Sequence, residues 1–294
     1  MNMNKLKIDF CHFKKQFSKY VFVFLKYLFL LLIALFLLLP FYWMFNVALQ
    51  SNYSDISWYP KEFTLQNFVN FFSSKFHFFS RFVSTILVVG ISTILGVVIS
   101  AIIAFALSLL EFKTKKIIFG VFLVTTMITT ESMFLINYKT VAYLGLVNPG
   151  QGSLIPGGVY LALVLPFLIN FVHIFLLMQN IQKIPKELYL SAKVDGSNDF
   201  KFLRKILIPL LKGNLINIII FRAVSAWNAY LWPQLVGAKL LTNEIRIFYD
   251  SEQKQNLINE QMAALVVITI PLILLFLFCK KYILEGKLNS GIKG

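Results

Sequence analysis

The sequence predicts an all-α polytopic membrane protein with six transmembrane helices, and three observations lead to this fold class. Hydrophobic residues make up 58% of the 294 residues, charged residues only 14%, and the mean hydropathy is +0.73. A soluble domain has roughly 45–50% apolar and about 25% charged residues. The chain also contains six long apolar stretches, and its Lys and Arg residues gather in alternate connecting segments. The lipid bilayer is therefore the environment that this composition fits.

The six apolar stretches approach or exceed the length of about 20 helical residues that crosses the hydrocarbon core. The fifth is the least apolar, because it contains Pro209, Lys212 and Arg222. No small-residue cleavage site follows the first, so we expect an uncleaved span rather than a signal peptide. The predicted spans are residues 27–49, 82–110, 117–137, 154–178, 206–232 and 262–279, in a transmembrane domain at 21–282 that is flanked by cytoplasmic segments at 1–20 and 283–294.

The distribution of positive charge predicts the orientation of these spans. With a cytoplasmic N-terminus, 20 Lys and Arg residues lie in inner segments and 7 lie in outer loops. Because Lys and Arg are enriched on the cytoplasmic side of membrane proteins, both termini are predicted to lie inside. The net charge of +15 then reflects membrane orientation, and no nucleic-acid partner is expected. Cys11 and Cys279 lie at span edges, where they form neither a disulfide framework nor a metal-ligand set.

Two charged residues inside predicted spans are candidates for a translocation pathway. Glu131 and Arg222 each lie about 14 to 15 residues along a span, which is roughly 21 to 22 Å of helical rise from its inner end. Isolated intramembrane charges usually face the bundle interior or pair with one another. We therefore expect Glu131 and Arg222 to lie near each other or to line one pathway. The alternatives are that each reaches the outer interface separately, or that the predicted span limits are off by one turn.

Further polar and aromatic residues could line the same pathway. Asn170 precedes His173 by about one helical turn, so both are expected on one side of the fourth span. His173 is more simply a packed polar residue than a metal ligand. In the segment WNAYLWP, residues 227–233, the candidates for stacking and hydrogen bonding are Trp227, Asn228, Tyr230 and Trp232. An outer aromatic belt is the alternative role for Tyr230 and Trp232.

The most polar stretch between spans is KELYLSAKVDGSNDF, residues 186–200, within a predicted cytoplasmic loop at 180–205. Pro185 and Glu187 suit the start of a helix. The Asp195-Gly196 pair then predicts a turn, and Ser197 or Asn198 can cap a second helix that begins near Asp199. The expected unit is a helix, a tight turn and a helix along the membrane surface. Its expected contact surface for a partner protein comprises Leu188, Ala192, Phe200 and Leu203, with an ordinary interfacial amphipathic helix as the alternative.

The segment IPKELYLSAKVDGSNDFKFLRKILIPL, residues 184–210, resembles the EAA loop of binding-protein-dependent ABC importers. In that family the loop is a cytoplasmic coupling helix that sits in a cleft of the ATPase. WNAYLWP is similar to the Trp-Asn element of carbohydrate permeases. The tail at 282–294 and the outer segment at 58–68 are similar to those of the maltose-type second permease subunit. The matching positions of the loop are Ile184, Pro185, Glu187, Leu188, Ala192, Asp195, Gly196, Phe200 and Pro209.

One departure from the family lies in the loop's signature, where Leu190-Ser191-Ala192 stands in place of Glu-Ala-Ala. The acidic residue of the family is therefore absent. The helix and the turn should persist, so docking is expected to survive while a polar contact to the ATPase is lost or altered. Glu131 and Arg222 are further departures, and they favour an unusual substrate or a divergent subunit.

The resemblance implies a permease subunit in the plasma membrane of a prokaryote that forms half of a pathway for a sugar or oligosaccharide. It implies as partners a homologous second permease, two ATPase subunits and an extracytoplasmic solute-binding protein. The chain has no G-x-x-x-x-G-K-[ST] phosphate loop, so ATP and Mg²⁺ are expected in the ATPases, with no cofactor, metal or catalytic residue here. The alternatives are a permease for glycerol phosphate, peptide or phosphate, and, from other classes, a membrane enzyme or a structural scaffold.

Overall fold

The computed structural model describes residues 3–51, 57–73, 77–147, 153–250 and 258–288. These residues form helices, with one isolated β-bridge between Gln50 and Phe63 and no strand in the described ranges. The chain divides into two compact units. One contains Met1–Ser73 and Gln255–Val267, and the other contains Ser74–Lys254 and Ile268–Gly294.

The first unit begins with a single long helix, α1, at Met3–Ala48. Apolar side chains between residues 20 and 45 are largely exposed, as Phe36 is at 76%. Such a surface is stable in lipid, because hydrocarbon is as apolar as the side chains themselves. The unit also holds α2, Gln66–Ser73, and the beginning of α14, Ile258–Leu288.

Buried amides hold the end of α1 in the first unit. Asn67 donates from Nδ2 to the carbonyl oxygens of Ala48 and Gln50, both at 2.9 Å. Asn259, at the beginning of α14, donates to the same Gln50 oxygen at 2.6 Å. Carbonyls at a helix C-terminus have no partner within their own helix, so these amides satisfy groups that would otherwise be buried without one.

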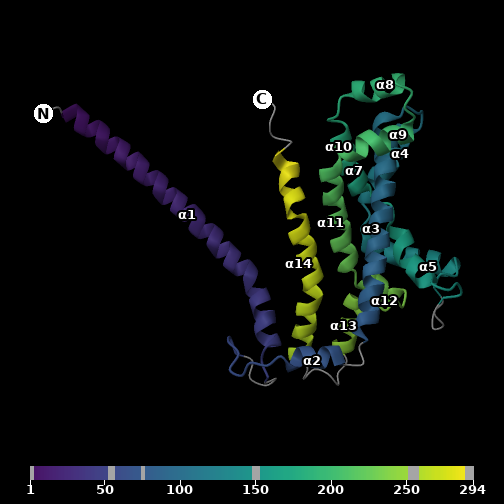
Figure 1. Ribbon diagram of the computed structural model, residues 1–294, viewed down its shortest axis with the longest axis horizontal. Helices are drawn as coiled ribbons and strands as arrows, with labels where there is room; N and C mark the ends of the chain where they lie inside the picture. Colours follow the sequence, from purple (N-terminus) through teal and green to yellow (C-terminus); the bar gives the residue numbers. More distant parts are fainter. Residues whose placement is uncertain (1–2, 52–56, 74–76, 148–152, 251–257, 289–294) are drawn as a thin grey trace. The chain divides into compact units, whose positions relative to one another are not determined.

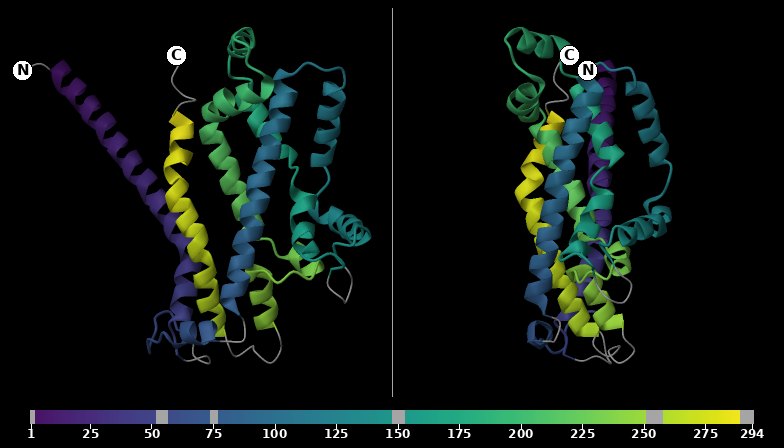
Figure 2. Two further views of the ribbon diagram at one scale, coloured as in Figure 1. Left: turned by 45° about the vertical axis from the view of Figure 1, so that its right-hand side comes forward. Right: turned by 90° about the vertical axis from the view of Figure 1, so that its right-hand side faces the viewer.

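The second unit is built on α3, Phe78–Leu109, against which α7, Phe171–Ile181, and α11, Lys212–Trp227, pack. Figures 1 and 2 show these three helices side by side from different directions. Small residues such as Gly96, Ser100 and Ala104 lie on the buried side of α3 and allow close approach. The core of the unit includes Val97, Ala101, Ala104, Phe105, Ile174, Leu177, Ile181, Phe202, Leu207 and Ile218.

The third predicted span, residues 117–137, is not one straight helix. It consists of α4, Lys115–Thr126, and α5, Thr130–Tyr143, which meet at an angle of 106°. Thr129 adopts an extended conformation at the beginning of α5, and Glu131 lies in the first turn. A carboxylate there is favourable because the N-terminus of a helix carries partial positive charge. The sequence Thr129-Thr130-Glu131 is thus a helix start that the apolar pattern alone concealed.

The fourth and fifth predicted spans are also interrupted. α6, Gly158–Val164, and η1, Leu165–Phe167, meet α7 at 47°. The segment Asp199–Leu210 meets α11 at 82°, so residues 206–210 belong to a different helical direction from the rest of the expected fifth span. That segment consists of α9, η2 and α10, at Asp199–Phe202, Leu203–Leu207 and Ile208–Leu210.

Three single helices are long and apolar enough to cross a membrane: Lys19–Ala48, Phe78–Leu109 and Ile258–Lys281. The three bent pairs, if each counts as one span, bring the total in the described residues to six. The number of spans therefore stays a prediction.

The second unit also contains two short helices, α12 at Leu231–Leu235 and α13 at Leu241–Asp250. An ion pair of 2.7 Å between Arg81 and Glu244 joins α13 to the beginning of α3. The backbone N–H of Leu241 also donates to Thr85 Oγ1 at 2.8 Å. These contacts fix α13 at the end of α3 opposite to α4 (Figure 1).

Candidate functional site

The polar segment between residues 186 and 200 folds as the helix, turn and helix that the sequence predicts. α8 covers Lys186–Val194, and Gly196 follows with a φ of +74°. The N–H groups of Gly196 and Ser197 donate to the carbonyls of Lys193 and Ala192, at 3.0 and 2.9 Å. Asn198, rather than Ser197, caps α9, because its Oδ1 accepts from the Lys201 N–H at 2.8 Å. The local conformation is therefore confirmed.

One side of α8 is fixed to the body of the unit through aromatic packing. The ring of Tyr189 lies 5.0 Å from that of Phe202, which is 1% exposed, and 6.2 Å from that of Phe105 on α3. Tyr189 also donates from its hydroxyl to Asp199 at 2.6 Å. Lys193 Nζ lies 2.6 Å from the same carboxylate, and this side-chain hydrogen bond raises the pKa of Lys193. α8 and α9 thus form one structural piece.

The exposed face of this piece differs from the expected one. Ala192 is 7% exposed and Leu203 6%, so the expectation that both face a partner is wrong. They are buried because α8 and η2 pack against this chain's own core. Leu188 is 37% and Phe200 66% exposed, as expected. Two further apolar side chains are exposed on α8, Leu190 at 60% and Val194 at 87%, and their i, i+4 spacing places them on one face.

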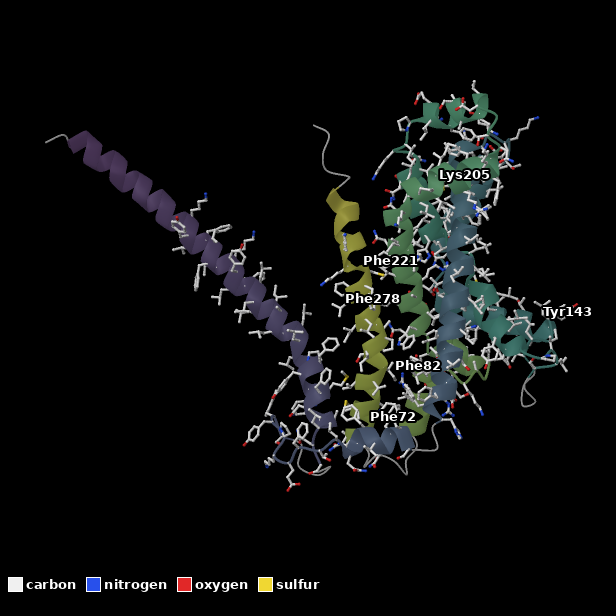
Figure 3. All side chains as sticks on the ribbon, in the orientation of Figure 1. Phe72, Phe82, Tyr143, Lys205, Phe221 and Phe278 are labelled. Atoms are coloured by element: carbon white, nitrogen blue, oxygen red, sulfur yellow. The ribbon has the colours of Figure 1, made fainter. Side chains whose placement is uncertain are left out.

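The segment lies at one end of the second unit. Figure 1 shows α8 at the same end of the unit as the beginning of α4, with α13 at the opposite end of α3. In Figure 3, Lys205 marks the α8 end and Phe82 lies towards the other. The Lys-rich stretches at 113–116 and 183–212 therefore share an end of the bundle, as the predicted orientation requires.

A cavity of about 470 Å³ lies in the same unit. Its wall combines ionisable, amide, hydroxyl and aromatic side chains from α3, α5, α7, α11 and α12. Its lining residues include Ser92, Thr130, Glu131, Phe134, Leu163, Phe167, Asn170, His173, Arg222, Ser225, Tyr230 and Trp232. In the described part of the chain no three His, Cys, Asp or Glu side chains converge as metal ligands.

Arg222 is the most buried charged residue of this wall, at 6% exposure. Its Nη2 donates to the carbonyl oxygens of Phe167, at 2.8 Å, and Ser92, at 3.4 Å. Its Nη1 lies 3.4 Å from His173 Nδ1. Because a guanidinium can only donate, Nδ1 must be the acceptor and the proton of a neutral ring must reside on Nε2.

Glu131 and Arg222 line the same cavity, but their expected equal depth does not follow from the structure. The depth of Glu131 was calculated for a straight third span. The 106° bend between α4 and α5 shows that this span is not straight. Glu131 is exposed, and the partners that the structure gives Arg222 are two carbonyls and an imidazole. Whether the two charges act together in transport stays a hypothesis.

Asn170 and His173 both line the cavity, although no continuous helix relates them as the sequence suggested. Asn170 lies at the break before α7 and caps that helix, because its Oδ1 accepts from the His173 N–H at 3.3 Å. Capping brings the two residues together at the first turn of α7.

The aromatic segment at 227–233 divides between two cavities. Trp232 and Tyr230 line the polar cavity, and Trp232 donates from Nε1 to the Ala162 carbonyl at 3.1 Å. Trp227 instead lines a separate, apolar cavity of about 340 Å³ between α3, α11 and α14. Asn228 is exposed at the C-terminus of α11 and is not a lining residue of the polar cavity.

Several lining residues were not expected from the sequence. Ser92, Thr130 and Ser225 contribute hydroxyl groups, and Phe134 and Phe167 surround Trp232 with ring centroids at 5.7 and 5.6 Å. Isolated Ser, Thr and Phe residues are common in membrane spans, so no sequence signal distinguished these. Only the bends in the third and fourth spans bring them to one place.

Comparison with known proteins gives a family match over most of the chain. Residues 13–286 match the family described as "Binding-protein-dependent transport system inner membrane component". The chain is 27% identical over 237 residues to the arabinooligosaccharides transport system permease protein AraQ of Bacillus subtilis, covering 80% of this chain and 81% of that protein. It is 29% identical over 262 residues to the trehalose transport system permease protein SugB of Mycobacterium tuberculosis, covering 87% and 92%.

Two further likenesses extend this comparison. The sn-glycerol-3-phosphate transport system permease protein UgpE of Brucella abortus is 28% identical over 191 residues, 64% of each chain. A solved bacterial ABC transporter involved in the import of the acidic polysaccharide alginate superposes with a TM-score of 0.76, at 20% identity, over 90% of this chain and 98% of that one. This likeness confirms the predicted all-α membrane fold. The extent of the family match shows that the chain belongs to the binding-protein-dependent transport system inner membrane components.

Proposed function

Because the chain is an inner membrane component of a binding-protein-dependent transport system, we propose that it forms half of an importer's pathway for a sugar or oligosaccharide. The observation that carries this proposal is the cavity of about 470 Å³. Sugars present hydroxyl groups and apolar C–H faces. The wall offers Glu131, Asn170 and Ser225 for the hydroxyls and the rings of Tyr230 and Trp232 for the faces.

The proposal includes a coupling role for α8 and α9. Leu190, Val194 and Phe200 form an exposed apolar surface on a piece that is otherwise fixed to the unit by Tyr189 and Phe202. Exposed apolar patches of this kind mark interaction sites. A separate ATPase would bind this surface and supply the ATP hydrolysis that this subunit does not perform. The proposal places α8 on the cytoplasmic side, where the distribution of Lys and Arg also predicts both termini.

Glycerol phosphate is the second candidate cargo, and one observation favours it: Arg222 is the cationic residue among those that line the cavity. We place it second because Nη2 of Arg222 already donates to the carbonyls of Phe167 and Ser92, and Nη1 already lies against His173 Nδ1. UgpE, the relative named for glycerol 3-phosphate, shares a smaller part of the chain than AraQ or SugB does.

The test is reconstitution of the whole complex, with its partner permease, ATPase and binding protein, in proteoliposomes. Uptake and ATP hydrolysis are measured with arabinooligosaccharides, trehalose and glycerol 3-phosphate. We expect a neutral sugar to stimulate both activities, and Trp232→Ala to reduce uptake of that sugar more than Asn228→Ala, which alters a residue outside the cavity wall. Stimulation by glycerol 3-phosphate alone would favour the second candidate, and failure to co-purify an ATPase would overturn the coupling role.

A further inference from the structure

The side chain of Arg222 joins four elements of the second unit. It extends from α11 to the Ser92 carbonyl on α3, to the Phe167 carbonyl at the end of η1 and to His173 on α7. A charged residue this deeply buried in a membrane protein is costly, so it is retained where it performs a function. Its contacts here are two backbone carbonyls and one imidazole, on helices that are far apart in the sequence.

Gly96 on α3 makes room for the guanidinium. A Cβ atom at this position would lie 1.9 Å from both Cζ and Nη2 of Arg222, so any other residue would displace the side chain. The guanidinium therefore lies directly against the backbone of α3. Arg222 and Gly96 form a matched pair, which we call the Arg222 clamp.

The clamp holds the break in the fourth predicted span. Phe167 is the last residue of η1, and the chain turns by 47° before α7 begins at Phe171. Carbonyls at the C-terminal end of a helix have no intrahelical partner and carry partial negative charge. The Arg222 guanidinium satisfies one of these carbonyls and complements its charge. The position of η1 consequently depends on the position of α11.

α11 is also the helix that follows the proposed coupling piece. The chain passes from α8 through α9, η2 and α10 directly into α11, with a bend of 82° at Leu211. Any displacement of α8 and α9 therefore reaches α11 through the backbone. Phe167 lies in the cavity wall, so the clamp connects α11 to that wall by side-chain contact.

We propose that Arg222 is a positioning residue that transmits movement of the α8–α10 segment, through α11, to the broken fourth span and the wall of the cavity. This rests on the proposed coupling of α8 and α9 to an ATPase. Arg222 acts through the Phe167 carbonyl rather than on the cargo, since both Nη2 bonds go to the protein and its Nε is buried away from solvent. In the Arg222→Gln variant, α11 should still move with the α8–α10 segment, whereas the broken fourth span should no longer move with α11.

The experiment uses the complete complex in lipid nanodiscs, with Cys11→Ser and Cys279→Ser as background. Ser225→Cys reports on α11 itself, and Leu163→Cys reports on α6, across the clamp; both positions line the cavity. Labelling rates with a methanethiosulfonate reagent are compared between the nucleotide-free and the ATP–vanadate state. With Arg222 present, both reporters should change severalfold. With Arg222→Gln, Ser225→Cys should still change and Leu163→Cys should not, with partial recovery in Arg222→Lys.

A double-mutant cycle controls for a purely structural role. Gly96→Ala should abolish the response of Leu163→Cys when Arg222 is present, and should change little further when residue 222 is already Gln. An undiminished response of Leu163→Cys in Arg222→Gln would overturn the clamp while leaving the proposed coupling in place. A lack of response at both reporters with Arg222 present would overturn the coupling itself. If Gly96→Ala reduced the labelling response of Leu163→Cys equally with Arg222 and with Gln at position 222, Gly96 and Arg222 would not act as a unit. This result would also overturn the clamp.

Discussion

The α8–α9 piece and the cavity are built in different ways. Hydrogen bonds within the α8–α9 piece join residues close in sequence, ten positions apart for Tyr189 and Asp199 and three for Asn198 and Lys201. The Arg222 contacts join residues 49, 55 and 130 positions apart. The first region is a locally determined unit that can move as one body. The second is an assembly of broken helices, whose shape changes when any of them moves.

This difference suits the two proposed roles. A piece that receives force from a partner must not deform, and local bonds with buried rings supply that stiffness. A wall that opens and closes must respond to distant displacement, and broken helices joined by one side chain supply that response. Four predictions test the contrast, in order of decreasing effect.

The largest effect is expected from Phe202→Ala. Phe202 is 1% exposed and packs on Tyr189 and Phe105, so its truncation leaves a void that should cost about 3–5 kcal/mol. Thermal unfolding of the purified complex measures the loss. The matched control is Phe200→Ala, two residues earlier and 66% exposed, which should change stability by no more than about 0.5 kcal/mol. Similar losses for both would show that the two faces of the piece are not distinct.

The next effect concerns partner binding rather than folding. Leu190→Asp and Val194→Asp place charges on the exposed face of α8 and should each weaken ATPase binding by about 2 kcal/mol or more if they occupy the centre of the interface. The amount of ATPase that co-purifies with this subunit measures the change. Ser191→Asp, about 100° around the same helix from Leu190, is the control and should retain the ATPase. Retention in all three variants would remove this face from the interface.

A smaller effect is expected at the turn. Gly196 has a φ of +74°, and a side chain in this left-handed conformation costs roughly 1–2 kcal/mol. Gly196→Ala should therefore lower the unfolding temperature, whereas Gly196→Asn should lower it less, because Asn tolerates the conformation. The coupling of transport to ATP hydrolysis, measured as uptake per ATP hydrolysed, should decline in the same order as the unfolding temperature. Equal behaviour of Ala and Asn would indicate that the backbone conformation is not what limits the turn.

The smallest effects are expected from substitutions of the two helix-capping residues, Asn198 of α9 and Asn170 of α7. Asn198 accepts from Lys201 at 2.8 Å, and Asn198→Ala should cost about 1 kcal/mol of stability. Asn170 accepts from His173 at the longer distance of 3.3 Å, so Asn170→Ala should cost less. Because Asn170 lines the cavity, its substitution should affect uptake more than stability. The reverse order of stability losses would show that the α7 cap, not the α9 cap, is the stiffer element.

Sequence reasoning was most accurate where structure is local. The turn at Asp195-Gly196, the second helix from Asp199 and the exposure of Phe200 follow from residue types within a few positions. It failed for Ala192 and Leu203. These two side chains are buried against core residues that other helices contribute, such as Phe105 of α3. It also failed for the third span, since apolar composition cannot show that residues 127–129 break a helix by 106°.

The sequence alone determined that the chain belongs in a membrane, because apolar composition sets the transfer free energy whatever the packing. It also determined the conformation of the α8–α9 piece, because caps and left-handed glycines act over a single turn. Only the tertiary structure decided that Arg222 binds the carbonyls of Ser92 and Phe167 and that Gly96 gives it room. The physical reason is that a carbonyl left free by a break, and the close approach that a missing Cβ allows, exist only after distant helices have packed.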